Sequence, residues 1–100
     1  DMPTRSAAGH EIELRQPRPA ELELVEGVGP KIAELLIANG IYDLADLAET
    51  SVESVRKILS DAGRRFRLAD PGTWQEQAAH GAAGKWDELS ELQVRLKAGR

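Results

Sequence analysis

The sequence predicts an all-α fold, a compact bundle of five to six short helices, and three observations support this prediction. Apolar residues recur with the 3.6-residue period of a helix face in one segment after another. Glycine, proline, serine and threonine separate these segments, as they do where helices begin and end. Apart from residues 11–14, no stretch alternates apolar and polar residues as a half-buried strand would.

Composition limits the classes of protein to which the chain can belong. Its 100 residues fit one domain, and 41% apolar with 30% charged residues is a globular composition. The absence of cysteine excludes disulfides and thiolate metal sites. No apolar run approaches the roughly 20 residues that span a bilayer, so we expect no membrane insertion and a cytoplasmic location.

The domain is expected to occupy residues 21–100, after a flexible arm or linker at residues 1–20. Pro17 and Pro19 disfavour a helix in the arm, and the alternation of residues 11–14 fits at most a short extended piece.

The domain begins with a pair of short helices around a glycine turn. An apolar patch at residues 22–25 ends at Gly27-Val28-Gly29. A second helix is predicted from Pro30, because proline suits the first helical turn. Asn39-Gly40 ends this helix with a residue that tolerates positive φ.

Three further helices are expected. Residues 41–48 have the spacing of a short connecting helix, and Thr50-Ser51 caps the helix that ends at Gly63. A basic loop covers residues 64–70. Asp70 or Thr73 then caps a helix with Pro71 just inside it.

The last two predicted helices each begin close to a tryptophan. One runs through Trp74 to about residue 83, and the other occupies residues 85–97 and contains Trp86. Base stacking is one interpretation of the two indoles, but their apolar spacing favours core packing for both.

The glycine turn is the segment with the clearest chemistry. Gly27 and Gly29 can take positive φ and let another molecule approach the backbone. A helix is expected to start here, so its first N–H groups, those of Gly29, Lys31 and Ile32, lack intrahelical partners. These groups lie at the positive end of the helix dipole. Such an arrangement favours a phosphate, beside the positive charge of Lys31.

The turn resembles that of the helix-hairpin-helix family of DNA-binding modules. The family pattern of an apolar residue, any residue, Gly, apolar and Gly fits residues 25–29, and its continuation fits Pro30, Lys31 and Ala33. The resemblance implies that Gly27, Val28, Gly29, Lys31 and Ile32 contact a DNA phosphate without reading sequence. It also implies a possible monovalent cation, K⁺ or Na⁺, on the carbonyls of Glu23, Val25 and Val28.

The rest of the chain is similar to small bacterial helix-hairpin-helix domains that are appended to larger proteins. The segments that carry this likeness are Gly63-Arg64-Arg65-Phe66 and residues 70–78. The second half repeats the order helix, break, helix, but residues 63–71 lack a second Gly-x-Gly turn. The second hairpin is therefore degenerate, and a symmetrical grip on both strands of a duplex is not expected.

Charge leaves two interpretations of the surface open. Residues 1–50 carry four basic and ten acidic side chains, whereas residues 51–100 carry nine and seven. Arg64, Arg65 and Arg67 form the densest basic cluster and are expected either to hold a second phosphate or to pair with Asp61 and Asp70.

The sequence thus predicts a binding module with no enzymatic activity, for duplex DNA or structured RNA, weak and dependent on salt. The alternative is a structural or protein-interaction domain of a larger bacterial protein, which the acidic first half favours. An enzyme is the least expected class, because no nucleotide-binding glycine loop or Ser/His/Asp set is present and only two histidines occur.

Overall fold

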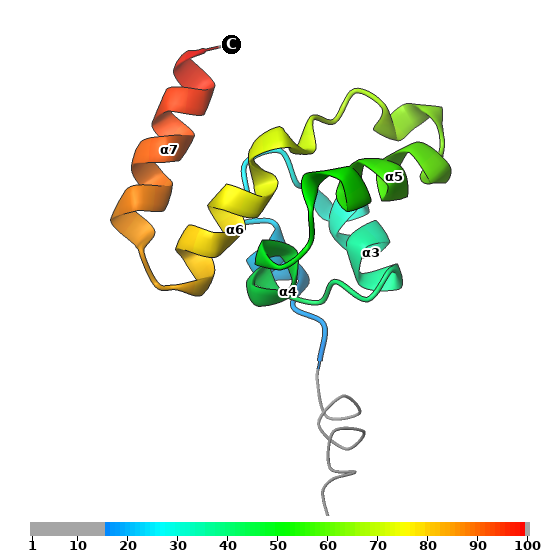
Figure 1. Ribbon diagram of the computed structural model, residues 1–100, viewed down its shortest axis with the longest axis horizontal. Coiled ribbons are helices and arrows are strands. Elements are labelled where there is room, and N and C mark those ends of the chain that lie inside the picture. Colours follow the sequence, from blue (N-terminus) through cyan, green and yellow to red (C-terminus); the bar gives the residue numbers. More distant parts are fainter. Residues whose placement is uncertain (1–15, 100) are drawn as a thin grey trace, which may run out of the picture.

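The computed structural model describes residues 16–99, which form an all-helical bundle without a strand in that range (Figure 1). Its elements, in chain order, are α2 (Pro19–Leu22), α3 (Pro30–Ala38), α4 (Leu44–Ala48), α5 (Val52–Ala62), η1 (Arg64–Phe66), η2 (Pro71–Thr73), α6 (Trp74–Ala82) and α7 (Trp86–Ala98). The predicted fold class is confirmed. The alternation expected at residues 11–14 lies outside the described residues.

Local signals set most of the helix ends. The Ser51 hydroxyl accepts a hydrogen bond from the Ser54 N–H at 3.1 Å and so caps α5. The Asp70 carboxylate accepts one from the Gly72 N–H at 3.0 Å, at the start of η2. Gly40 and Gly63 have φ of +86° and +130°, as residues after a helix often do. The predicted boundaries at these positions are confirmed.

The expectation that proline disfavours a helix before residue 21 is wrong at Pro19. Helix α2 begins at Pro19, so the last two residues assigned to the arm are helical. Proline occupies the first helical position, where its missing N–H costs nothing, and the Arg18 N–H is bonded to the Tyr42 carbonyl at 2.8 Å. Proline would break a helix at an interior position, but at the first position, as here, it is compatible with the helix.

Helix α6 lies at the centre of the bundle, with α7 along one side and α3 and α5 on the other (Figure 1). Helix α4 packs against α6, and α2 contacts both α3 and α4. The main core is aliphatic apart from two aromatic side chains, those of Phe66 and Trp74. Both belong to the second half of the chain, so this half supplies the largest core residues.

The two tryptophans have different environments. Trp74 is 1% exposed, so the prediction of core packing is confirmed for it. Trp86 is 51% exposed at the start of α7, and the same prediction is wrong there. Among the helices, α7 makes its main contacts with α6, and its side chains Leu89 and Leu92 are buried, whereas Trp86 in its first turn remains half open to solvent.

Candidate nucleic-acid interface

The turn between α2 and α3 has one glycine in a left-handed conformation. Gly27 has φ of +105°, whereas Gly29 has φ of −97° in extended backbone and caps α3. The expectation of positive φ is therefore right for Gly27 and wrong for Gly29. Val28 between them is 5% exposed, and its N–H is bonded to the Val25 carbonyl at 3.0 Å. Val28 thus anchors the turn, and its N–H is already engaged.

Three amides at the start of α3 are open to a ligand. Within residues 16–99, the N–H groups of Gly29, Lys31 and Ile32 have no hydrogen-bond acceptor. The first helical bond comes from the Ala33 N–H, which donates to the Gly29 carbonyl at 2.9 Å. No side chain caps this helix. Unpartnered amides and the helix dipole together make this end attractive to an anion.

The basic loop contributes to the same place. A shallow hollow of about 320 Å³ lies between residues 29–32 at the start of α3 and the pair Arg65 and Phe66 of η1. The Arg65 guanidinium stacks on the Phe66 ring, 4.9 Å from its centroid. Phe66 is almost fully buried, so it fixes the arginine beside the hairpin. The structure thus joins Arg65 to the predicted hairpin residues.

Arg64 and Arg67 lie on the same exposed loop but do not line this hollow. Neither they nor Arg65 has an ion-pair partner in the described part of the chain, contrary to the pairing with Asp61 and Asp70 considered above. Asp61 and Asp70 are instead paired with basic side chains of helix α5.

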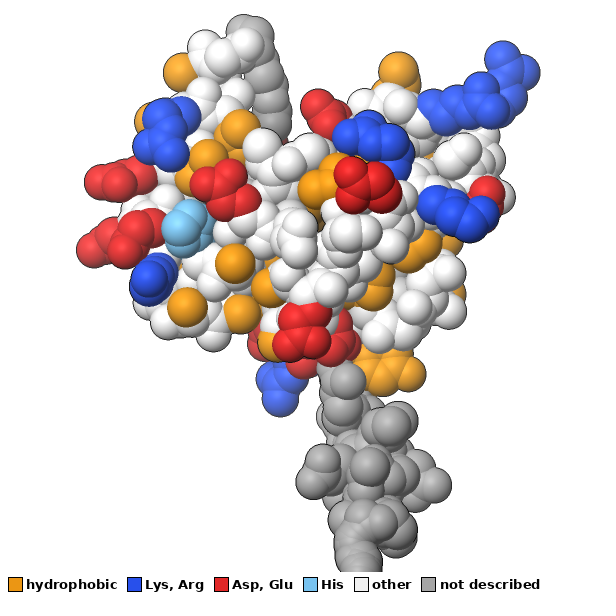
Figure 2. Space-filling model, in the orientation of Figure 1, with side chains coloured by type: hydrophobic (Ala, Val, Ile, Leu, Met, Phe, Trp, Pro, Cys, Tyr) orange, Lys and Arg blue, Asp and Glu red, His pale blue; other side chains and the backbone are white. Residues whose placement is uncertain are grey.

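The two acids of that region are bound by α5 side chains. Lys57 pairs with Asp61 at 3.0 Å, and Arg56 approaches Asp70 at 4.0 Å. Within residues 16–99 no acidic side chain therefore pairs with the loop arginines, and basic side chains gather over α5 and the loop after it (Figure 2).

The turn rests on the indole of Trp74. A Cβ atom built on Gly27 would lie 2.8 Å from Trp74 Nε1, closer than real Cβ contacts come. By contrast, a Cβ on Gly29 meets no atom within 4 Å. Gly27 is thus required by the fold, while Gly29 faces open space where a ligand can approach.

A buried glutamine, which is not among the residues predicted from the sequence, holds the turn from α6. The Gln77 side chain is fully buried; its Oε1 accepts from the Glu26 N–H at 2.7 Å and its Nε2 donates to the Glu26 carbonyl at 3.2 Å. Nε2 also donates to Thr73 Oγ1 at 3.1 Å. The available signal was a polar residue one turn after Trp74, on the face that also holds Ala78.

Helix α7 reaches the turn as well. Gln93 Nε2 donates to the Leu24 carbonyl at 2.7 Å and to Gln77 Oε1 at 3.0 Å. Lys97 Nζ lies 3.8 Å from the Glu26 carboxylate, whose side chain is 21% exposed. The acid inside the turn therefore has a cationic partner, which lessens its repulsion of a phosphate.

Another acid beside the turn is used by the fold. Glu21 Oε1 accepts from the Leu44 N–H at 3.2 Å, and its other oxygen lies 3.9 Å from Arg18. Of the three acids near the turn, Glu23 is the most exposed. The acidic side chains that oppose a polyanion are thus partly neutralised by contacts within the domain.

The cation expected on the Glu23, Val25 and Val28 carbonyls stays a prediction. The Val25 carbonyl accepts a hydrogen bond from Val28, which leaves it one further lone pair. Among the described residues, no group of three or more histidine and carboxylate side chains is placed to hold a metal. Residues 16–99 also contain no helix with the length and apolarity needed to cross a bilayer.

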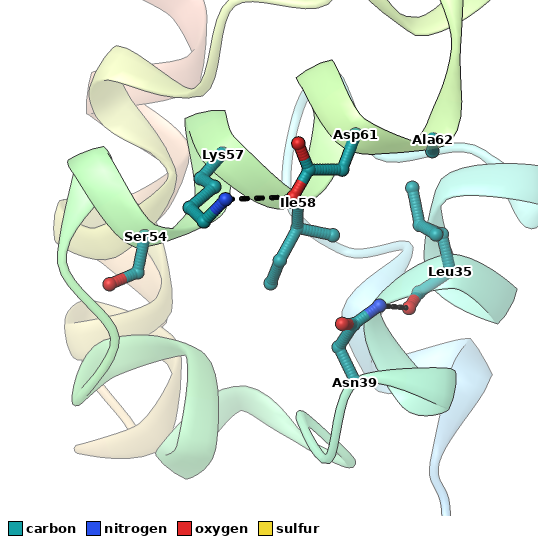
Figure 3. Close-up of a pocket in the computed structure, with 7 residues that line it drawn as sticks. All are labelled: Leu35, Asn39, Ser54, Lys57, Ile58, Asp61 and Ala62. Carbon is teal, nitrogen blue, oxygen red and sulfur yellow. Dashed lines mark hydrogen bonds and ion pairs between the residues drawn. The ribbon is translucent and has the colours of Figure 1, made fainter.

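A second hollow lies at the other end of α3 and contains none of the predicted site residues. It measures about 400 Å³ and opens between α3 and α5. Figure 3 shows Leu35 and Ile58 inside it, with the Lys57–Asp61 pair along one rim and Asn39 donating to the Leu35 carbonyl. Lys57 and Asp61 of this hollow are paired with each other, so it offers no cation comparable to Arg65 beside the hairpin.

Comparison with protein-family models identifies a family. Residues 22–82 match the family model described as RS2/RL21/YNQ2 HHH domain, where HHH denotes helix-hairpin-helix. The matched range extends from the end of α2 to the last residue of α6 and excludes α7. Neither curated proteins nor solved structures gave a match.

Proposed function

Because the chain belongs to the RS2/RL21/YNQ2 family of helix-hairpin-helix domains, we propose that it is a module that binds the phosphate backbone of duplex DNA without reading sequence. The observation that carries the proposal is the shared hollow, where open amides of Gly29, Lys31 and Ile32 lie beside the Arg65 guanidinium. Amides and arginine are the groups that proteins use to hold phosphate. In this proposal the domain binds and does not catalyse.

The affinity of such a site is expected to be low. One hairpin and one arginine engage few phosphates, so binding weakens steeply as salt rises. The module would then act by raising the local concentration of a larger protein on nucleic acid. Structured RNA carries the same phosphate chemistry and is the second ligand to assay.

Gly29→Val is the first test, because the fold tolerates a side chain there. We expect the free energy of unfolding to fall by about 0.5–2 kcal/mol, the usual range for unfavourable changes at a helix N-cap, so the variant stays folded. Affinity for a short duplex should fall about tenfold or more, because the branched side chain blocks charge-assisted bonds worth about 1.5–3 kcal/mol each. Fluorescence anisotropy at low salt measures the affinity.

Ala38→Val, an exposed position at the opposite end of α3, is the matched control and should bind as the unaltered protein does. Amide NMR shifts should concentrate on residues 29–32 and fade with added salt. Unchanged duplex binding by folded Gly29→Val would contradict the hairpin mechanism.

Arg65→Ala tests the contribution of the loop. Removing this guanidinium should weaken binding about equally for all sequences and lower the slope of log K against log[salt] by about 1. Lys57→Ala removes a charge already paired with Asp61 and should leave the slope unchanged. Salt titrations of both variants measure the slope. If Arg65→Ala has the same slope as Lys57→Ala, Arg65 lies outside the interface.

The second candidate function is a protein-interaction domain, and the outer surface of α7 favours it. Trp86 on this helix is 51% exposed, and tryptophan is enriched at protein interfaces; Val94 on the same helix is 65% exposed. A stable dimer in sedimentation experiments, together with no duplex binding at low salt, would support this function over the first.

A further inference from the structure

Leu68 is an exposed apolar residue beside the candidate interface. Its side chain is 96% exposed, the highest value among the large apolar residues of the described chain. The loop that carries it is ordered by hydrogen bonds, with the Arg67 N–H bonded to the Arg64 carbonyl at 3.0 Å and the Ala69 N–H to the Phe66 carbonyl at 3.2 Å. The fold thus presents Leu68 to solvent on a fixed loop without using it in the core.

Leu68 forms part of the rim of a third hollow, which measures about 460 Å³. Ala69 and Leu96 give it apolar walls, and Gly27 of the hairpin lines it as well. The volume lies in the range of about 300–1,000 Å³ that is typical of small-ligand sites. The loop therefore runs alongside the hairpin in space. Arg65 lines the phosphate hollow, and Leu68 lines the third hollow.

The polar groups of this hollow are mostly acceptors. Glu26 and Asp70 are among the lining residues, and each carboxylate has a cationic neighbour, Lys97 and Arg56 respectively, that offsets its charge. Thr73 Oγ1 accepts a bond from Gln77, which leaves its hydroxyl proton to donate. Apolar walls with acceptors suit a flat heterocycle that carries an exocyclic amino group, as adenine, cytosine and guanine do.

We propose that this hollow receives an unpaired nucleobase, with Leu68 against the ring, next to the phosphate held at the hairpin. The inference rests on the proposed function, since the hairpin and the loop arginines bring the backbone to this place. Proteins commonly read unpaired bases by contact with their ring faces and edges. The preferred ligand is then a duplex with a bulged base that carries an amino group, namely adenine, cytosine or guanine, and a fully paired duplex occupies the phosphate site alone.

The experiment compares three DNA duplexes of the same flanking sequence: fully paired, with one bulged adenine, and with one bulged thymine. Anisotropy gives the affinity of the full chain for each, and 2-aminopurine at the bulge reports the environment of the base by its fluorescence. We expect the bulged adenine to bind roughly tenfold tighter than the paired duplex, because the ring covers the exposed apolar side chain of Leu68. Thymine, which lacks the amino group, should gain less.

Leu68→Ser should abolish the preference for the bulge and leave affinity for the paired duplex within about twofold, since an exposed residue changes stability little. Val94→Ser, which alters an exposed apolar residue outside the hollow, should retain the preference. Equal binding of bulged and paired duplexes, or a preference that survives Leu68→Ser, would overturn this inference and leave the hairpin mechanism standing. No binding to any duplex at low salt would overturn the proposed function, and this inference with it.

Discussion

Gly27→Ala is expected to destabilise the domain by about 2–6 kcal/mol, because one methyl group incurs two separate costs. The first is the backbone, since φ of +105° is rarely adopted by a residue with a side chain, at about 1–3 kcal/mol. The second is the clash of the new Cβ with Trp74 Nε1 at 2.8 Å, and overpacking of this kind costs about 1–3 kcal/mol.

Gly40→Ala separates the two costs. Gly40 has φ of +86°, but a Cβ there meets no atom within 4 Å, so only the backbone cost of about 1–3 kcal/mol applies. Urea denaturation of both variants measures the difference. Trp74→Phe places a smaller ring under the turn. This substitution should therefore destabilise the Gly27→Ala variant less than it destabilises the unaltered protein. Equal losses for the two glycine variants would show that the indole can move aside.

The second large effect is expected for Gln77→Leu, with a loss of about 2–6 kcal/mol. Leucine fills most of the space but leaves the Glu26 N–H and carbonyl without their buried partner, at about 1–3 kcal/mol for each group. Chemical denaturation gives the stability. Amide exchange at Glu26 reports the local effect, because its N–H loses the acceptor that protects it.

Gln75→Leu is the matched control on the same helix. The Gln75 side chain is half-buried and makes one bond to the Ala48 carbonyl at 3.0 Å. Its loss should cost no more than about 1.5 kcal/mol. If both variants lose equal stability, the Gln77 side chain does not hold the turn as the structure indicates.

Local signals were enough to predict most of the fold from the sequence. Caps such as Ser51 and Asp70 and stops such as Gly40 act within a few residues, so their effects could be read from the chain. Trp86 was placed in the core wrongly, because periodicity shows which face of a helix is apolar but not whether a neighbour covers it.

The candidate site was predicted in part. The glycine turn and the amides at the start of α3 follow from a short motif. The choice of Arg65 among three arginines, and the role of Gln77, depend on contacts between distant segments. A single sequence carries no signal for such contacts.

The side-chain amides that hold the turn also set the order in which the domain is completed during synthesis. The bond from the Glu26 N–H to Gln77 spans 51 residues, and that from Gln93 to the Leu24 carbonyl spans 69. The chain emerges from the ribosome amino end first, so residues 22–32 are released well before the helices that fix them. A nascent chain that ends before α6 therefore lacks the shaped turn, and the proposed contact with nucleic acid would await nearly the whole domain.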